Sequence, residues 1–134
     1  MLNLETINKF AKELSGEYYK EIVQADFDRK LNQGTTKFMT LDKNGETISL
    51  ATLHFVESIT RKSLVIEDLI VAEEYREQGW GKDLVEQIIK LGEKMEVDCI
   101  EVCTKKNNKK ARRLYEKQGF KERNNVPYRL WLKK

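Results

Sequence analysis

The sequence predicts an α/β fold in which helices flank a mixed, mostly antiparallel twisted sheet, in the order α-α-β-β-β-α-β-α-β-β. Two observations support this prediction. Segments whose apolar residues recur at helical spacing are interspersed with segments in which apolar residues alternate. An Asn-Gly pair at 44–45 also separates two extended segments, as is typical of a β-hairpin. Such a set of elements folds as helices layered on a sheet.

Two helices are predicted before the first strand. In the first, over residues 4–14, the apolar residues with helical spacing are Leu4, Ile7, Phe10, Ala11 and Leu14. Ser15-Gly16 ends this helix. We expect a second helix over about 17–31.

Three extended segments follow. Residues 36–41 and 47–56 are the two arms of the hairpin, joined by Asp42-Lys43-Asn44-Gly45. Residues 63–71 are β-branched and apolar, which predicts a third strand.

The second half of the chain contains two helices and three strands in the prediction. A helix follows residue 82, because apolar residues there recur at spacings of four, three and four: Leu84, Ile88, Leu91 and Met95. The remaining predicted elements are a strand over 97–104, a short helix over 109–118 and a final hairpin of 120–123 with 128–132.

The chain is predicted to be one domain over residues 1–134. With 134 residues, of which 40% are apolar, it buries roughly two thirds of its unfolded surface. It has no repeat and no Pro-, Gly- or Ser-rich linker. No window approaches the roughly 18 apolar residues of a membrane span, and residues 1–5 do not resemble a secretory signal. We expect a cytoplasmic protein without a membrane partner.

The sequence suggests no metal site. It has two cysteines, Cys99 and Cys103, and one histidine, His54, without a Cys-x-x-Cys pair. The cysteines lie four apart in a predicted strand, so we expect two buried, reduced thiols on one face. We expect a structural role for His54.

The positive charge is concentrated near the C-terminus. Residues 105–134 contain 12 Lys and Arg against two Glu, a net charge of +10, which leaves −7 for the rest of a chain of net charge +3. The basic third suits an anion such as nucleic acid or a nucleotide-like cofactor, and the acidic part suits a cation. Alternatively, these charges are solvated helix faces.

Residues 76–82 contain a candidate phosphate-binding turn. Asp83 follows Lys82, which excludes a Walker loop, and Leu84 stands where a dinucleotide fingerprint needs its third glycine. The remaining pattern is Arg76-x-x-Gly79-x-Gly81 before a helix. Glycines here allow a tight turn and close approach of a pyrophosphate to the helix N-terminus. The alternative is a turn that only joins a strand to a helix.

Two motifs together resemble a known family. Arg76-Glu77-Gln78-Gly79-Trp80-Gly81 resembles the Arg/Gln-x-x-Gly-x-Gly/Ala signature of the GNAT superfamily of acyl-CoA N-acyltransferases. The segment from Asn108 through Ala111, Leu114 and Tyr115 to Gly119-Phe120 is similar to that family's Asn-x-x-Ala-x-x-Leu/Phe-Tyr-Glu-x-x-Gly-Phe segment. The resemblance covers about residues 37–132 and implies a single GNAT-like domain that uses acetyl-CoA. That family usually begins with a short strand, which we expect to be absent or very short here.

The resemblance also implies a cofactor site. Backbone groups of Leu69, Ile70 and Val71 would pair with the pantetheine arm. The signature residues implied at the cofactor are Arg76, Glu77, Gln78, Gly79, Trp80, Gly81 and Lys82, with 78–82 at the pyrophosphate. Asn108, Ala111 and Tyr115 match residues that contact the cofactor, the last near the thioester sulfur. Trp80 would pack under the helix or cover the cofactor.

Glu67 and Tyr115 are the candidate catalytic residues. Residues 66–71 with Tyr75-Arg76 are similar to a segment of diamine acetyltransferases, in which the glutamate matching Glu67 faces the amine. An alkylammonium has a pKa near 10, so a base is needed, and Glu67 could act through water. Strand alternation places Asp68 on the opposite face, unless a bulge exchanges the two. The alternatives are an exposed strand carboxylate for Glu67 and an aromatic core residue for Tyr115.

The sequence thus predicts an N-acetyltransferase that works by direct attack of a primary amine in a ternary complex. A small cationic amine is the expected acceptor, and a protein lysine or N-terminus is the next choice. The competing hypothesis is a non-catalytic module that binds nucleic acid or protein through its basic third. A homodimer would be compatible with either function.

Overall fold

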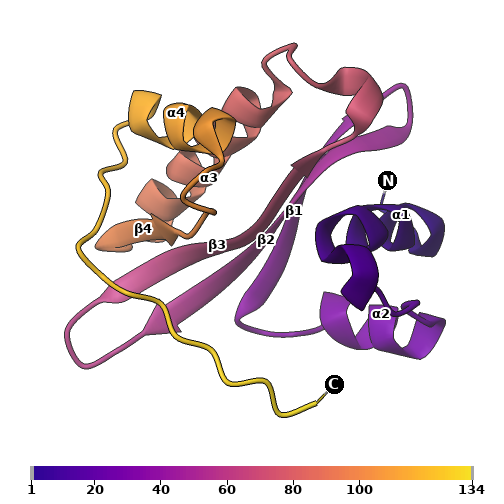
Figure 1. Cartoon of the computed structure of the whole chain (residues 1–134), viewed down its shortest axis with the longest axis horizontal. Coiled ribbons are helices and arrows are strands. Elements are labelled where there is room, and N and C mark those ends of the chain that lie inside the picture. The colour runs from indigo at the N-terminus through magenta and orange to yellow at the C-terminus, as the bar shows by residue number, and fades with distance from the viewer. Residues whose placement is uncertain (1, 134) are drawn as a thin grey trace.

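The computed structural model describes residues 2–133, in which a four-stranded sheet lies between two pairs of helices (Figure 1). The strands are β1 (Thr36–Lys43), β2 (Glu46–Glu57), β3 (Lys62–Val71) and β4 (Cys99–Val102), in that spatial order. The first three pair antiparallel, and β4 runs parallel to β3. The predicted mixed, mostly antiparallel sheet is therefore confirmed.

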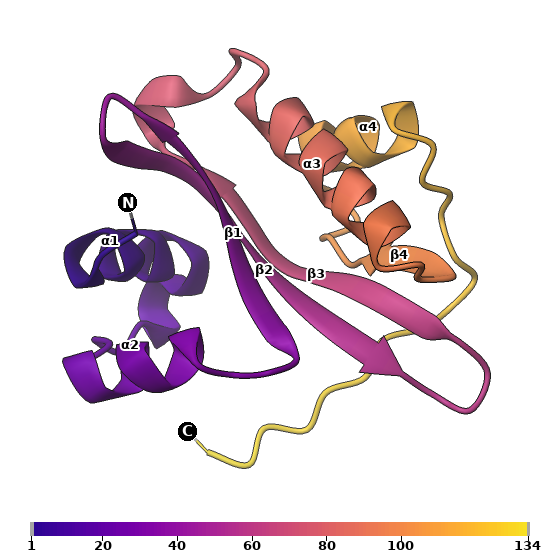
Figure 2. The same ribbon diagram turned by 180° about the vertical axis from the view of Figure 1, so that it is seen from behind.

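The helices form two layers, one on each face of the sheet (Figures 1 and 2). On one side lie α1 (Leu4–Ser15), the short 3₁₀ helix η1 (Gly16–Tyr18) and α2 (Gln24–Leu31). On the other lie α3 (Trp80–Lys94) and α4 (Lys109–Lys117), and the 3₁₀ helix η2 (Glu73–Tyr75) leads from β3 toward α3. Helix α1 begins at Leu4, so among the described residues no strand precedes it.

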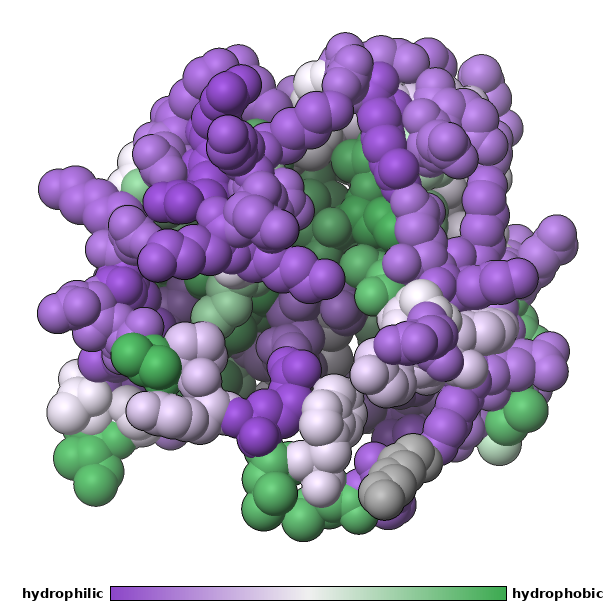
Figure 3. Space-filling view, in the orientation of Figure 1, coloured by the Kyte–Doolittle hydropathy of each residue, from purple (hydrophilic) through white to green (hydrophobic). Residues whose placement is uncertain are grey.

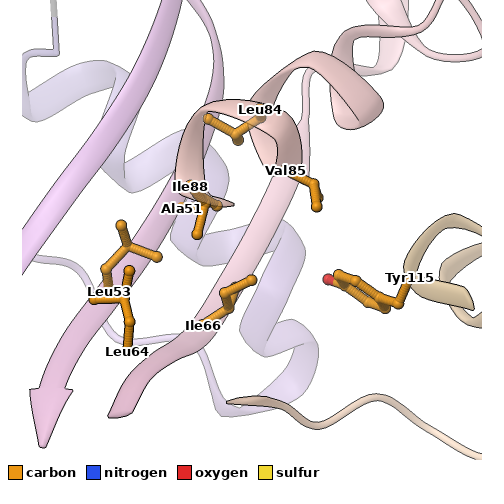
Figure 4. Close-up of a cluster of buried hydrophobic side chains, with 8 residues drawn as sticks. All are labelled: Ala51, Leu53, Leu64, Ile66, Leu84, Val85, Ile88 and Tyr115. Atoms are coloured by element: carbon orange, nitrogen blue, oxygen red, sulfur yellow. The ribbon is translucent and has the colours of Figure 1, made fainter. Parts of the chain in front are cut away.

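Each face of the sheet has its own hydrophobic core. The larger core joins β2 and β3 to α3 and α4, and its buried members are Ala51, Leu53, Leu64, Ile66, Leu84, Val85, Ile88 and Tyr115 (Figure 4). The smaller core joins the sheet to α1 through Phe10, Leu50, Ile70 and Ala72. Strand β2 is buried on both faces, since Leu50 faces one core and Ala51 the other.

Local sequence signals account for the first helix and the hairpin. The Asn3 side chain accepts a hydrogen bond from the Thr6 N–H at 2.9 Å, and Gly16 ends α1 with a positive φ of 56°. Asn44 and Gly45 both have positive φ, as a tight hairpin turn of the primed type requires. Both predictions are confirmed.

The helix expected over 17–31 is instead two separate pieces. Residues between η1 and α2 are not helical, and the Asn8 side chain explains why. Its amide accepts a hydrogen bond from the Ile22 N–H at 2.7 Å and donates to the Ile22 carbonyl at 2.9 Å. The Tyr19 hydroxyl also donates to Asn8 at 2.9 Å. This side chain satisfies backbone groups that a continuous helix would have paired.

The final hairpin, predicted over 120–123 and 128–132, is not formed in the described residues. Arg123 pairs with Glu101 of β4 at 2.5 Å, and Trp131 stacks on Tyr18 with ring centroids 6.2 Å apart. The segment thus contacts β4 and η1 through side chains, and Pro127 has no N–H for a strand ladder. A two-stranded hairpin that does not pair with a larger sheet is marginally stable at best.

Strand β4 is shorter than the predicted 97–104, which changes the environment of the cysteines. Pairing with β3 ends at Ile66 opposite Val102. Cys99 is half-buried within the strand, whereas Cys103 lies beyond its end and is exposed. The prediction of two buried thiols is therefore wrong, because Cys103 is exposed and Cys99 is only half-buried.

Gly92 of α3 is the glycine that packing most strongly requires. A Cβ built there would lie 2.9 Å from Ile100 Cδ1 and 3.3 Å from Val97 Cγ2. We expect Gly92→Ala to lower the free energy of unfolding by about 1–3 kcal/mol through overpacking, despite the higher helix propensity of alanine. Urea denaturation measures this difference, and an unchanged or higher stability would show that Ile100 moves away freely.

Candidate active site

A cavity opens where β3 and β4 diverge. The two strands pair only over Ser63–Ile66 and Cys99–Val102, so within residues 2–133 the edge of β3 that faced β4 has no neighbouring strand beyond Ile66. The cavity has a volume of about 360 Å³, and we call it the β3–β4 cavity. Its lining residues are Leu14, Ile66, Glu67, Asp68, Leu69, Val102, Cys103, Thr104, Lys105, Asn108, Ala111, Leu114 and Tyr115.

A β-bulge at Glu67 sets the direction of the β3 side chains. Thr52 of β2 is opposite Asp68 and Leu53 is opposite Ile66, so Glu67 has no partner residue. Before the bulge Ile66 packs in the α3 core, whereas after it Ile70 packs against α1. The bulge thus reverses the alternation. The strand-alternation expectation for Asp68 is wrong, because Glu67 and Asp68 line the same cavities.

A second cavity lies between the sheet and the α1–α2 layer, and we call it the α1-side cavity. Its volume is about 540 Å³, and Leu14, Glu67 and Asp68 line both cavities. In the space-filling view the face toward the viewer is hollowed, with apolar side chains inside the hollow (Figure 3). The two cavities therefore meet at a pair of carboxylates.

Tyr115 reaches the β3–β4 cavity from α4. Its side chain is 7% exposed and contacts Phe120 edge to face, with ring centroids 5.5 Å apart. The ring extends from α4 toward Ile66 and Val85 with its hydroxyl oxygen leading (Figure 4). Burial raises the pKa of Tyr115 to about 12, so the phenol keeps its proton at neutral pH. Tyr115 is thus an aromatic core residue that also lines the β3–β4 cavity.

The turn before α3 has the geometry of an anion site. Gly79 caps the helix with a φ of 91°, a left-handed conformation that favours glycine. The first N–H groups of a helix have no partner within it, and the helix dipole favours negative charge there. Gly81 does not have positive φ, and a Cβ there would make ordinary contacts with Leu114 at 3.6 Å and Val71 at 3.8 Å. The turn itself therefore requires only the first glycine.

Three side chains of the turn contact protein groups. Arg76 donates from Nε to the Val71 carbonyl at 2.9 Å and also pairs with Glu13 of α1. Glu77 pairs with Lys110 of α4, whose hydrogen bond lowers the pKa of the Glu77 carboxyl. Gln78 donates to the Glu74 carbonyl at 3.1 Å. These contacts fix the turn against α1, β3 and α4.

Trp80 and Lys82 lie in the first turn of α3. The Trp80 ring is half-buried, and the ammonium of Lys43 lies 5.6 Å from its centroid. The ring therefore contacts Lys43 at the end of β1, and whether it packs under the helix or covers the cofactor stays a prediction. Lys82 is exposed and lies 3.9 Å from Glu86, a weak surface pair.

The predicted residues of the second motif gather at the β3–β4 cavity. Asn108 caps α4 by accepting a hydrogen bond from the Ala111 N–H at 3.1 Å, and both line the cavity with Tyr115. Leu69 joins them from β3, whereas the Ile70 side chain packs in the opposite core. A role for Ile70 at the cavity is therefore restricted to its backbone.

Sequence reasoning missed several residues of these cavities. Strand alternation alone misplaces Asp68, and the bulge that sequence analysis left open as an alternative is present at Glu67. Lys20 and Lys30 line the α1-side cavity, and no motif marks them. His54 lies there as well, with Nδ1 2.9 Å from Thr36 Oγ1, consistent with its expected structural role. Among residues 2–133 no cluster of three His, Cys, Asp or Glu could bind a metal ion, and no helix is long and apolar enough to span a membrane.

The fold is similar to several solved acetyltransferase structures. An aminoglycoside acetyltransferase, meta-AAC0020, from an uncultured soil metagenomic sample, solved with trehalose, superposes with a TM-score of 0.86 at 17% identity, covering 96% of this chain and 89% of that one. For a putative acetyltransferase from Agrobacterium tumefaciens the TM-score is 0.82 at 21% identity, with 96% and 92% covered. For AAC(6')-Iy with a CoA bisubstrate analogue it is 0.78 at 18% identity, with 96% and 90% covered.

The family comparison agrees with the fold and with the two motifs. No curated protein matches this chain by sequence. The model of the acetyltransferase (GNAT) family, however, matches residues 4–120, which include the turn before α3, β4 and α4. The chain therefore belongs to the GNAT family of acetyltransferases and is an acetyl-CoA-dependent N-acetyltransferase.

Proposed function

We propose that this enzyme transfers the acetyl group to a small primary amine by direct attack within a ternary complex. The observation that carries the proposal is that the two cavities meet at Glu67 and Asp68. One cavity has the features of a cofactor site, and the other is large enough for a small acceptor. Both ligands could thus be bound at once, with their reacting groups at the shared wall.

The β3–β4 cavity and the turn before α3 fit acetyl-CoA. The open edge of β3 after Ile66 can pair with an extended amide-containing arm. The N-terminus of α3, with Gly79 in the left-handed conformation, suits a pyrophosphate. When bound, acetyl-CoA supplies the acetyl group as an activated thioester. Lys105 lines the cavity and is available for an anionic group of the cofactor.

The carboxylates at the junction are suited to prepare the amine. An amine with a pKa near 10 is almost entirely protonated at neutral pH, so it must lose a proton before it attacks. Glu67 is exposed and can take that proton directly or through water. Asp68 is half-buried beside it and can bind the ammonium form and orient it. We assign Glu67 the role of base and Asp68 a role in binding the amine.

Tyr115 is suited to protonate the departing thiolate. A thiol has a pKa near 8.5, so the phenol is the weaker acid; its hydroxyl can donate a hydrogen bond to the departing thiolate, and the transferred proton is replaced from solvent. The Tyr115 hydroxyl has no hydrogen-bond partner among the described residues, which leaves it available for this step. Its position in the wall of the β3–β4 cavity supports this role.

A pair of matched substitutions tests the assignment of the carboxylates. Glu67→Gln should lower kcat by about 10²–10³ because general base catalysis is lost, without changing the affinity for acetyl-CoA. Asp68→Asn should mainly raise the KM for the amine. Glu57→Gln, an exposed glutamate at the end of β2, is the control and should behave like the parent. Wild-type kcat in both cavity variants would exclude a catalytic role for the junction.

A further inference from the structure

We infer that the acceptor carries an anionic group in addition to its reactive amine. This inference rests on the proposed function and specifies its substrate class. It comes from the distribution of charge in the α1-side cavity, which differs from the simple acidic surroundings expected for a cationic amine.

Side chains of both charges line this cavity. Glu67 and Asp68 lie where it joins the β3–β4 cavity, because both residues line both cavities. Lys20 and Lys30 line the α1-side cavity alone, Lys20 from the segment before α2 and Lys30 from α2 itself. Two carboxylates and two ammonium groups give these four side chains a net charge of zero. The cavity therefore matches a molecule with both signs of charge.

The two lysines are available to a ligand. Neither has an ion pair or side-chain hydrogen bond with another residue in the part of the chain that the structure describes, unlike Lys9, which pairs with Glu74 at 3.6 Å. Lys30 is also half-buried, which reduces the solvent screening of a charge placed beside it. An ammonium group can bind either a carboxylate or a phosphate as a point charge. A polycation, in contrast, would be repelled by this end of the cavity.

Apolar side chains also line this cavity. Phe38 and Leu50 line it from the sheet, and Ile22 lines it from the segment before α2. The polar pair on the sheet, Thr36 and His54, hydrogen-bond to each other at 2.9 Å. The preferred acceptor is therefore a molecule with an amine at one end, a carbon chain or ring in the middle and a carboxylate or phosphate at the other end.

Comparing acetyl transfer to amino acids and to their primary amides tests whether the enzyme prefers acceptors with an anionic group. The assay measures acetyl transfer to amino acids with two to six carbons between amine and carboxylate, and to their primary amides. One aminoalkyl phosphate and 1,5-diaminopentane complete the panel. We expect kcat/KM to be at least tenfold higher for the best acid or phosphate than for its uncharged counterpart or the diamine, mainly through KM. A phosphate preferred over every carboxylate would identify the anion as a phosphate.

Lysine variants test whether these side chains cause the preference. In Lys20→Met and Lys30→Met, which retain length and apolar stem, the preference for the anionic acceptor should fall about tenfold. Transfer to the amide should stay within about twofold of the parent. Lys94→Met, on the last turn of α3, is the control and should keep the full preference.

The outcomes distinguish the inference from the proposed function. If amides or the diamine are acetylated as well as the acids, or if both lysine variants keep the preference, the inference is overturned and the proposed function stands. If the enzyme binds acetyl-CoA and acetylates no amine of the panel, the proposed function is overturned, and the inference with it.

Discussion

Gly81→Glu is expected to weaken acetyl-CoA binding by about 100-fold or more. Residue 81 is the second residue of α3, where the N–H groups and the helix dipole favour an anion. A glutamate there places a negative charge beside the expected pyrophosphate and competes for the same N–H groups. Isothermal titration of the purified variant with acetyl-CoA measures the loss.

Gly81→Ala is the matched control for this experiment. A Cβ at residue 81 would make only ordinary contacts, at 3.6 Å to Leu114 and 3.8 Å to Val71. The alanine variant should therefore fold normally and bind acetyl-CoA within about threefold of the parent. Equal affinity of the glutamate variant and the parent would show that the pyrophosphate does not lie at this helix terminus.

Tyr115→Phe is expected to lower kcat by about 10²–10³ with little change in acetyl-CoA affinity. Phenylalanine retains the ring that contacts Phe120 and removes the proton donor. Because burial raises the pKa of Tyr115 to about 12, ionisation of this phenol should not reduce kcat below about pH 10. Steady-state kinetics from pH 6 to 10 measure both effects.

A control variant and a stability measurement distinguish loss of the proton donor from a general effect of the substitution or from unfolding. Tyr128→Phe, in the exposed C-terminal segment, should keep the parent kcat. The Tyr115→Phe variant should unfold at a urea concentration near that of the parent at neutral pH, since the ring contacts remain. A folded variant with parent kcat would exclude Tyr115 as the acid.

Much of the fold could be predicted from the sequence because its signals are local. The cap at Asn3, the turn at Asn44 and Gly45 and the helical spacing from Leu84 to Met95 each act within a few residues. The prediction of one helix over 17–31 is wrong because the side chain of Asn8, more than ten residues away from Ile22, forms hydrogen bonds with the Ile22 backbone. Local patterns do not contain such long-range contacts.

The candidate site was only partly predictable for the same reason. The two motifs identified Gly79, Asn108 and Tyr115, and the latter two do line one cavity. The direction of Asp68 depends on a bulge whose register is set by pairing with Thr52 and Leu53 of β2. The positions of Lys20 and Lys30 in the α1-side cavity depend on how α2, and the segment before it, pack over the sheet. Both features arise from tertiary structure.

Simultaneous detection of both products of acetyl transfer tests whether this protein is an N-acetyltransferase. The purified enzyme is incubated with acetyl-CoA and the panel of primary amines, and free CoA thiol and N-acetyl product are both quantified by mass spectrometry. We expect one CoA to be released for each N-acetylamine formed, and both products to be lost in a Glu67→Gln, Tyr115→Phe double variant that still binds acetyl-CoA. Acetyl-CoA binding without any N-acetylamine, or full transfer by the double variant, would contradict this expectation.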